Sequence, residues 1–243
     1  MIKLVNDDFR NFVPTLEDES IDAIITDIPY CISKDNNFTT MKDRTGRNGI
    51  DFGEWDKDFN INDLKILVPK LKKGGTLFIF HSFEQYMDLI NIFEGDLEFK
   101  DRIIWRKSNP MSRNRDRRYI CNIEIASWYV KPGDKWTFNR QSDTYDECVL
   151  SYPTESNNNR IHPTQKNLNL MVDLVKRHTN KGDLVLDCFM GSGVTGVACV
   201  TNDRSFIGVE RNTEYFDKVV KRMRNETPMF LKGKIEVIKG DLS

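Results

Sequence analysis

The chain has 243 residues, of which 39% are hydrophobic and 30% charged, and its mean hydropathy of −0.54 is typical of a soluble protein with one sizeable core. No apolar run approaches the roughly 18 residues that cross a bilayer, and the start MIKLVNDDFR predicts no secretion signal. The net charge of −1 excludes a protein that is basic throughout, and five scattered Cys without a CxxC pair argue against a structural zinc site and fit a reducing cytosol.

Short runs rich in Ile, Val and Phe alternate with helical spacings along most of the chain. Strands are predicted at residues 2–5, 21–26, 76–80, 103–105, 123–129, 184–188, 206–209 and 235–238. Helices are predicted at about 62–71, 84–93, 165–179, 194–200 and 213–224. This alternation predicts an α/β fold with a mostly parallel sheet of seven to eight strands and helices on both faces.

Two polar stretches, 33–58 and 133–160, interrupt this alternation. Loops this long in a compact domain are usually functional or disordered. In an open α/β sheet, the loops at the carboxyl ends of the strands carry the ligands. We therefore expect one domain, 1–243, in which 33–58 is a mobile catalytic loop and 133–160 is an insert that recognises the target.

Basic side chains concentrate in residues 100–118, where eight Lys and Arg face only two Asp. One interpretation is a solvated loop. The other is a surface that contacts phosphates, since clustered Lys and Arg are the electrostatic footprint of nucleic-acid binding. The residues predicted to contact DNA are Arg106, Lys107, Arg113, Arg115, Arg117 and Arg118.

A glycine-rich turn follows the predicted strand at 184–188. Gly191, Gly193 and Gly196 match the spacing G-x-G-x-x-G, and Glu210 ends the next strand, where a carboxylate can hold ribose hydroxyls. A dinucleotide site, an S-adenosylmethionine (AdoMet) site and an ordinary tight turn all fit this pattern. Asp187 favours AdoMet, because a carboxylate would repel a pyrophosphate but suits a cationic methionine group.

The segment Asp27-Ile28-Pro29-Tyr30 ends the predicted strand at 21–26. An exocyclic amino group of a base is a poor nucleophile, because its lone pair is delocalised into the ring. Two acceptors that bond its two hydrogens can free that lone pair, and Asp27 together with the Ile28 carbonyl offers such a pair. Pro29 restricts where that carbonyl points, and the Tyr30 ring can support an unstacked base. The alternative is a simple proline turn with an aromatic plug.

These residues resemble a known family, the β-class DNA amino-methyltransferases. DIPY at 27–30 resembles the family's D-P-P-Y catalytic motif, DCFMGSG at 187–193 its AdoMet motif, and HPTQK at 162–166 its H-P-T-Q-K motif. IIWRKSNP at 103–110 and GGTL at 74–77 also resemble family segments. The order, catalytic motif before cofactor motif, implies a circularly permuted Rossmann-like fold of AdoMet-dependent methyltransferases.

The resemblance also assigns roles. It implies catalytic roles for Asp27, Ile28, Pro29 and Tyr30. It implies that Asp187 lies near the methionine part of AdoMet, that Glu210 holds the ribose, that Asp8 lies near the adenine, and that Thr164 and Lys166 help to close the cofactor site. The complete cofactor-binding set is Asp8, Thr164, Lys166, Asp187, Phe189, Gly191, Ser192, Gly193 and Glu210.

Three positions depart from the family pattern. Ile28 stands where the first proline is usual, which restores an N–H and is expected to loosen the turn while keeping the acceptor carbonyl. Cys31 stands where Asn is common, and we interpret it as a small packing residue because amino-methylation needs no covalent adduct with the base. Asp7 replaces the glycine of a G-D pair, which weakens the assignment of Asp8.

Because Asp is typical of adenine methylation at this position, the resemblance implies that AdoMet methylates the N6 amino group of an adenine flipped out of double-stranded DNA, giving S-adenosylhomocysteine. The alternatives are a cytosine-N4 methyltransferase, an NAD-dependent oxidoreductase, a catalytically silent DNA-binding homologue, and an enzyme with an RNA substrate. No metal is implied, because the three His lack ligand spacing. A cytoplasmic protein of a bacterial or phage-infected cell is expected, with no membrane partner, while a homodimer and a cognate restriction enzyme remain open.

Overall fold

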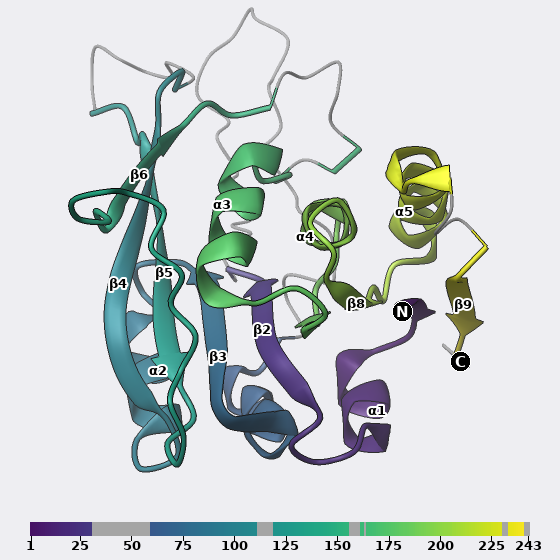
Figure 1. Cartoon of the computed structure of the whole chain (residues 1–243), viewed down its shortest axis with the longest axis horizontal. Helices are drawn as coiled ribbons and strands as arrows, with labels where there is room; N and C mark the ends of the chain where they lie inside the picture. The colour runs from purple at the N-terminus through teal and green to yellow at the C-terminus, as the bar shows by residue number, and fades with distance from the viewer. Residues whose placement is uncertain (31–58, 111–118, 156–160, 163, 230–232, 241–243) are drawn as a thin grey trace, which may run out of the picture.

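The computed structural model describes residues 1–30, 59–110, 119–155, 161–162, 164–229 and 233–240. Within them, nine strands form one sheet in the order β6-β4-β5-β3-β2-β7-β8-β1-β9 (Figure 1). The strands are β1 (Ile2–Asn6), β2 (Ile21–Asp27), β3 (Leu71–His81), β4 (Glu98–Lys107), β5 (Ile123–Val130), β6 (Val149–Tyr152), β7 (Leu184–Asp187), β8 (Ser205–Val209) and β9 (Ile235–Lys239). Only β5 runs antiparallel to its neighbours, β3 and β4, so the prediction of a mostly parallel sheet is confirmed.

Helices cover both faces of this sheet. The helices are α1 (Phe9–Phe12), η1 (Val13–Thr15), η3 (Ile61–Lys70), α2 (Tyr86–Phe93), α3 (Leu168–His178), α4 (Val194–Val200) and α5 (Thr213–Glu226). Helices α3, α4 and α5 pack on one face, which is turned toward the viewer in Figure 1, and α1, η3 and α2 pack on the other. Strand β2 contributes to the hydrophobic cores on both faces, because successive side chains in a strand point to opposite faces. Ala23 and Ile25 pack in the core under α3, α4 and α5, and Ile24 packs in the core under α1, η3 and α2.

The strand count differs from the prediction. All eight predicted strands are present, and the additional strand, β6, lies within the polar stretch 133–160 and pairs in parallel with β4. Its four residues are too few to show an alternating pattern on their own, so the pairing partner defines this strand. The predicted helix at about 62–71 is the 3-10 helix η3, which ends at Lys70 where β3 begins.

The sheet topology brings distant motifs to one edge. Strands β2, β7, β8 and β1 are consecutive neighbours and run parallel, so their carboxyl ends lie at the same edge. Asp27 ends β2, Asp187 ends β7, and Glu210 directly follows β8. The two halves of a site separated by 160 positions in the chain therefore meet across a single pair of strands.

Candidate active site

The glycine turn after β7 shapes one end of a large pocket. Gly191 and Gly193 have φ angles of 51° and 71°, a left-handed conformation that glycine adopts without strain. Gly193 is the N-cap of α4, and a Cβ there would lie 2.6 Å from a methyl carbon of Val219. Gly193 is therefore required both by the backbone conformation and by its close approach to α5. Ser192, between the two glycines, is buried and lines the same pocket.

Glu210, directly after the neighbouring strand β8, holds this turn in place by hydrogen bonds. Its carboxylate accepts hydrogen bonds from the backbone N–H of Gly191 at 2.9 Å and of Asn212 at 2.8 Å. Burial nevertheless raises the pKa of Glu210 to about 7, since two amide donors compensate only part of the lost hydration. A ligand that donated hydroxyl hydrogens to this carboxylate would favour its ionised form.

Asp187 connects the glycine turn to strand β2. It accepts hydrogen bonds from the hydroxyl of Thr26 at 2.8 Å and from the backbone N–H of Phe189 at 3.2 Å. Burial raises the pKa of Asp187 to about 6, while bonds from Thr195 and Thr26 oppose this rise. Because Thr26 directly precedes Asp27, this bond ties the position of the segment 27–30 to that of the glycine turn.

Aromatic rings form one wall of the pocket. The Phe189 ring lies 4.8 Å from that of Phe9 and 5.5 Å from that of Phe59, measured between centroids. Asp8 also lines the pocket, but it caps α1 and its two oxygens accept from the Arg10 guanidinium at 2.9 and 2.7 Å. Asp8 thus lines the pocket with its carboxylate engaged by the Arg10 guanidinium.

The segment 27–30 is held firmly at the other end of the pocket. The N–H of Ile28 donates to the Phe80 carbonyl at 3.2 Å, and the side-chain amide of Gln85 donates to the Pro29 carbonyl at 2.8 Å. The Tyr30 hydroxyl donates to Asp27 at 2.9 Å. The prediction that the N–H of Ile28 loosens the turn is therefore wrong. This N–H continues the β2–β3 ladder, a bond that proline in this position could not make.

Lys166 lies beside the carboxylate of Asp27. Its ammonium is 2.5 Å from an oxygen of Asp27 and 2.9 Å from an oxygen of Glu124, and its side chain is only 5% exposed. Burial lowers the pKa of this amine, but the two carboxylates outweigh burial and raise it to about 12. Lys166 thus lines the same pocket as the glycine turn, and its ammonium contacts Asp27.

Thr164 lies nearer the glycine turn. Its hydroxyl is 3.0 Å from Nδ1 of His162, whose ring packs edge-on against Tyr215 with centroids 4.4 Å apart. Burial lowers the pKa of His162 to about 4, so this imidazole is neutral at pH 7. The HPTQK segment therefore contributes side chains to both ends of the pocket.

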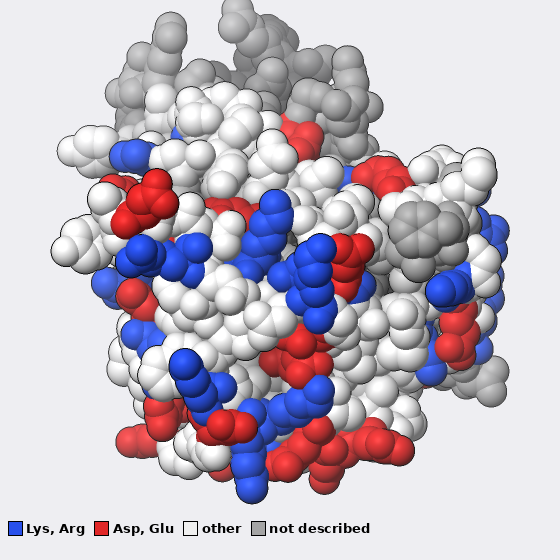
Figure 2. Space-filling view, viewed as in Figure 1, with Lys and Arg blue, Asp and Glu red and all other residues white. Residues whose placement is uncertain are grey.

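The predicted DNA-contacting residues are only partly described. Arg106 is exposed on β4 and donates to the Ser151 hydroxyl at 2.9 Å, whereas Lys107 forms an ion pair with Glu124 at 2.7 Å. Arg113, Arg115, Arg117 and Arg118 lie outside the described residues, as do Cys31 and the whole of the loop predicted at 33–58. On the face in Figure 2, basic and acidic side chains are interspersed over the described surface.

Several residues of the site were not identified from sequence, among them Thr26, Gln85 and Glu124. Thr26 and Glu124 lie on β2 and β5, and Gln85 is the N-cap of α2. Glu124 alone carried a signal, because a charged residue interrupts the apolar strand Ile-Glu-Ile-Ala. Among the described residues, no group of three or more His, Cys, Asp or Glu is placed to hold a metal ion, and no helix is long and apolar enough to span a membrane.

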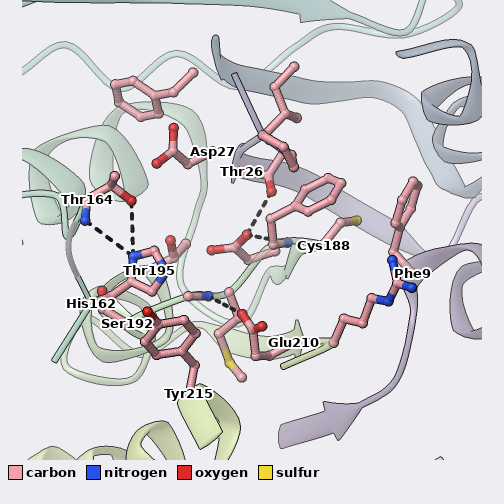
Figure 3. A pocket seen from close by; sticks show the side chains of 18 of the residues that line it. Phe9, Thr26, Asp27, His162, Thr164, Cys188, Ser192, Thr195, Glu210 and Tyr215 are labelled. Carbon is pink, nitrogen blue, oxygen red and sulfur yellow. Dashed lines mark hydrogen bonds between the residues drawn. The ribbon is translucent and has the colours of Figure 1, made fainter. Parts of the chain in front are cut away.

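The two ends form a single pocket, with an empty volume of about 1210 Å³ including its open mouth. Figure 3 shows Asp27 on the opposite side of it from Glu210. A sheet with this permuted order, a glycine turn and an acidic residue after the next strand has the Rossmann-like fold of AdoMet-dependent methyltransferases.

Comparison with known proteins places the chain within this class. Residues 21–221 match the family described as DNA methylase. The Type II methyltransferase M2.MboI of Moraxella bovis is 29% identical over 238 residues, which cover 90% of this chain and 86% of that protein. The crystal structure of the M1.HpyAVI–SAM complex has a TM-score of 0.72 and 33% identity, covering 92% of this chain and 99% of that chain.

A third comparison concerns the fold alone. The cytosine-N4-specific PvuII DNA methyltransferase has a TM-score of 0.72 over 97% of this chain and 94% of that chain, at 16% identity. The chain belongs to the DNA methylase family and is a DNA amino-methyltransferase. The resemblance and the permuted fold predicted from the three motifs are thereby confirmed.

Proposed function

We propose that this enzyme transfers the methyl group of AdoMet to the N6 amino group of an adenine that has been flipped out of double-stranded DNA. The observation that carries the proposal is that Asp27 and Tyr30 line the same pocket as the glycine turn and Glu210. A methyl donor held at one end and a base held at the other would face each other without a barrier between them.

The residues at the glycine end fit AdoMet. Glu210 offers a half-buried carboxylate to ribose hydroxyls, and Gly191 and Gly193 let the backbone approach closely. Phe189 offers an apolar wall, and Asp187 a carboxylate near the turn that suits a cationic group and disfavours a pyrophosphate. AdoMet, when bound, supplies a methyl group that is activated for attack by a positively charged sulfur.

The residues at the other end fit an amino group. Asp27 and the Ile28 carbonyl would accept its two hydrogens, which draws the nitrogen toward tetrahedral geometry and frees its lone pair. Tyr30 would support the ring of the flipped base. The bonds that hold Ile28, Pro29 and Tyr30 fix these acceptors before the base enters, so catalysis comes largely from positioning and preorganised electrostatics.

Adenine is favoured over cytosine by Asp27, since the family resemblance associates Asp at this position with adenine. The test is transfer of tritium from labelled AdoMet to duplex DNA, followed by separation of the modified nucleosides. We expect N6-methyladenine. N4-methylcytosine as the product would overturn the assignment of the base, and transfer to RNA alone would overturn that of the substrate.

The variant Asp27→Ala separates catalysis from cofactor binding. We expect it to abolish transfer while AdoMet affinity changes by less than about threefold, because Asp27 does not belong to the glycine end of the pocket. Loss of both properties together would contradict the role of Asp27. A thermal shift with NAD but not with AdoMet would support the oxidoreductase alternative, and AdoMet binding without any transfer would support a silent DNA-binding homologue.

For DNA engagement, we assign phosphate contacts to Arg106 and to the basic segment 100–118, and recognition of the target sequence to 133–160. Several apolar side chains are exposed near α2 and β4, among them Phe83, Met87 and Phe99, and they offer a surface for a homodimer. Sedimentation at several concentrations tests this assembly. A cytoplasmic location and a cognate restriction enzyme complete the proposal, by analogy with the Type II relatives.

A further inference from the structure

A chain of four alternating charges leads from the carboxylate of Asp27 to Lys107 on β4. Asp27 contacts Lys166 at 2.5 Å, Lys166 contacts Glu124 at 2.9 Å, and Glu124 contacts Lys107 at 2.7 Å. The four side chains come from β2, the segment before α3, β5 and β4, so only the folded sheet assembles them. Their charges sum to zero, which lets the cluster lie in a largely buried place.

Both oxygens of Asp27 already have donors in this structure. The Tyr30 hydroxyl donates to Oδ1 at 2.9 Å and the Lys166 ammonium to Oδ2 at 2.5 Å. An ionised carboxylate has about four lone-pair positions, so it can accept one more hydrogen while these donors remain. The two donors fix the plane of the carboxylate and leave the remaining lone pairs for an incoming amino group.

Glu124 decides how strongly Lys166 binds Asp27. If Lys166 had only Asp27 as a partner, its ammonium would cancel the negative charge that should stabilise the positive charge developing on the attacking nitrogen. Glu124 shares the same ammonium, so Asp27 keeps part of its charge. Glu124 in turn has a second cation, Lys107, which prevents it from becoming an unpaired buried anion.

We propose that Lys166 and Glu124 are positioning residues of the methyl transfer, and that their ion pair holds the Asp27 carboxylate charged and aimed at the amino group of the base. The inference rests on the proposed function, because it requires Asp27 to be the acceptor. It assigns Lys166 a role in base activation, in addition to its place in the lining of the cofactor pocket.

The charges around Asp27 predict how the rate of methyl transfer depends on pH. Burial raises the pKa of Asp27 and Lys166 opposes that rise, whereas Glu124 adds to it. Removing Lys166 should therefore move the acid limb of the single-turnover rate to higher pH, and removing Glu124 should not. Besides its fourth member, Lys107, the titratable groups facing the cluster are Tyr30, Asp187 and His162.

The experiment measures single-turnover methyl transfer to duplex DNA between pH 5.5 and 9 for the wild-type enzyme and three variants. Lys166→Met should lose about 100-fold in rate at pH 7 or more and shift the acid limb upward. Glu124→Gln should lose about 10-fold on the plateau without an upward shift. The double variant should be faster than Lys166→Met alone, because it no longer leaves Glu124 facing Asp27 without the lysine between them.

Matched controls come from an ion pair remote from the pocket. Lys3 and Glu236 pair at 3.5 Å across β1 and β9, and the variants Lys3→Met and Glu236→Gln remove the same groups. We expect both to keep the wild-type rate. AdoMet affinity and thermal unfolding are measured for every variant to establish that the fold and the cofactor site persist. If Lys166→Met fails to fold, the double variant replaces it, because it removes both charges of the Lys166–Glu124 pair.

The outcomes distinguish a failure of the proposed methyl transfer from a failure of the positioning role of Lys166 and Glu124. If the wild type does not methylate adenine, or Asp27→Ala retains activity, the proposed function fails. If both behave as expected but the Lys166 and Glu124 variants keep the wild-type rate and acid limb, only the present inference is overturned. A uniform loss of rate with no change in the pH profile, accompanied by weaker AdoMet binding, would instead assign Lys166 to the cofactor site alone and would also overturn it.

Discussion

Lowering the pH from 8 to 6 should weaken AdoMet binding through Glu210. Burial raises the pKa of this carboxyl to about 7, so it is mostly ionised at pH 8 and mostly protonated at pH 6. A carboxylate that accepts ribose hydroxyl hydrogens binds in its ionised form. The affinity for AdoMet is therefore highest above the pKa of Glu210 and is lost as the pH falls through that pKa.

The magnitude comes from the ionised fraction. For a pKa of about 7, that fraction falls about tenfold between pH 8 and pH 6, which raises the dissociation constant by about the same factor. Asp187, whose pKa burial raises to about 6, adds roughly a further twofold if it also binds in its ionised form. Together they predict a loss of about 20-fold.

Isothermal titration calorimetry at several pH values measures this effect. The α-amino group of AdoMet also titrates near pH 8, so the informative quantity is the difference between the wild type and Glu210→Gln. The variant should bind more weakly at pH 8 and should lose the component that depends on Glu210. Parallel pH profiles for the two proteins would refute the assignment of Glu210 to the ribose.

Three further predictions concern stability and the Asp187 contact. Gly193→Ala should cost about 1–3 kcal/mol, because φ is 71° there and the new Cβ would meet Val219 at 2.6 Å; an unchanged unfolding midpoint would contradict this. Asn139→Ala should lower stability in urea by about 1–2 kcal/mol, since its amide donates to two carbonyls at the end of α3, and no loss would show that water replaces these bonds. Thr26→Val removes the hydroxyl that donates to Asp187 and should move the pKa of that carboxyl above about 6, measured by the pH dependence of AdoMet binding; an unchanged profile would be evidence against the contact.

The turn at Ile28 shows how a sequence comparison can mislead about local geometry. The absence of the usual proline predicts a freer backbone when the segment is considered alone. In the fold, the end of β2 lies beside β3, and the Phe80 carbonyl accepts the N–H that proline would lack. A conformational freedom of the isolated segment is thus removed by a bond to a residue 52 positions away in the chain.

The sequence by itself determined the parts that depend on short segments. The glycine turn and most strands and helices follow from residue types at local spacing, because their backbone conformations are set within a few residues. The DIPY motif was recognised from its residue types alone, although its conformation depends on the bond to Phe80. Short β6 is the exception among the strands, since its definition depends on pairing with β4.

Only the tertiary structure decided which charges meet. Lys166 and Asp27 are separated by 139 positions, and Glu124 joins them from an antiparallel strand. No local pattern encodes these pairs, since the partner of a buried charge is determined by strand order and register. The reason is physical: a charge leaves water only where a partner compensates the lost hydration, and the folded sheet alone brings that partner within reach.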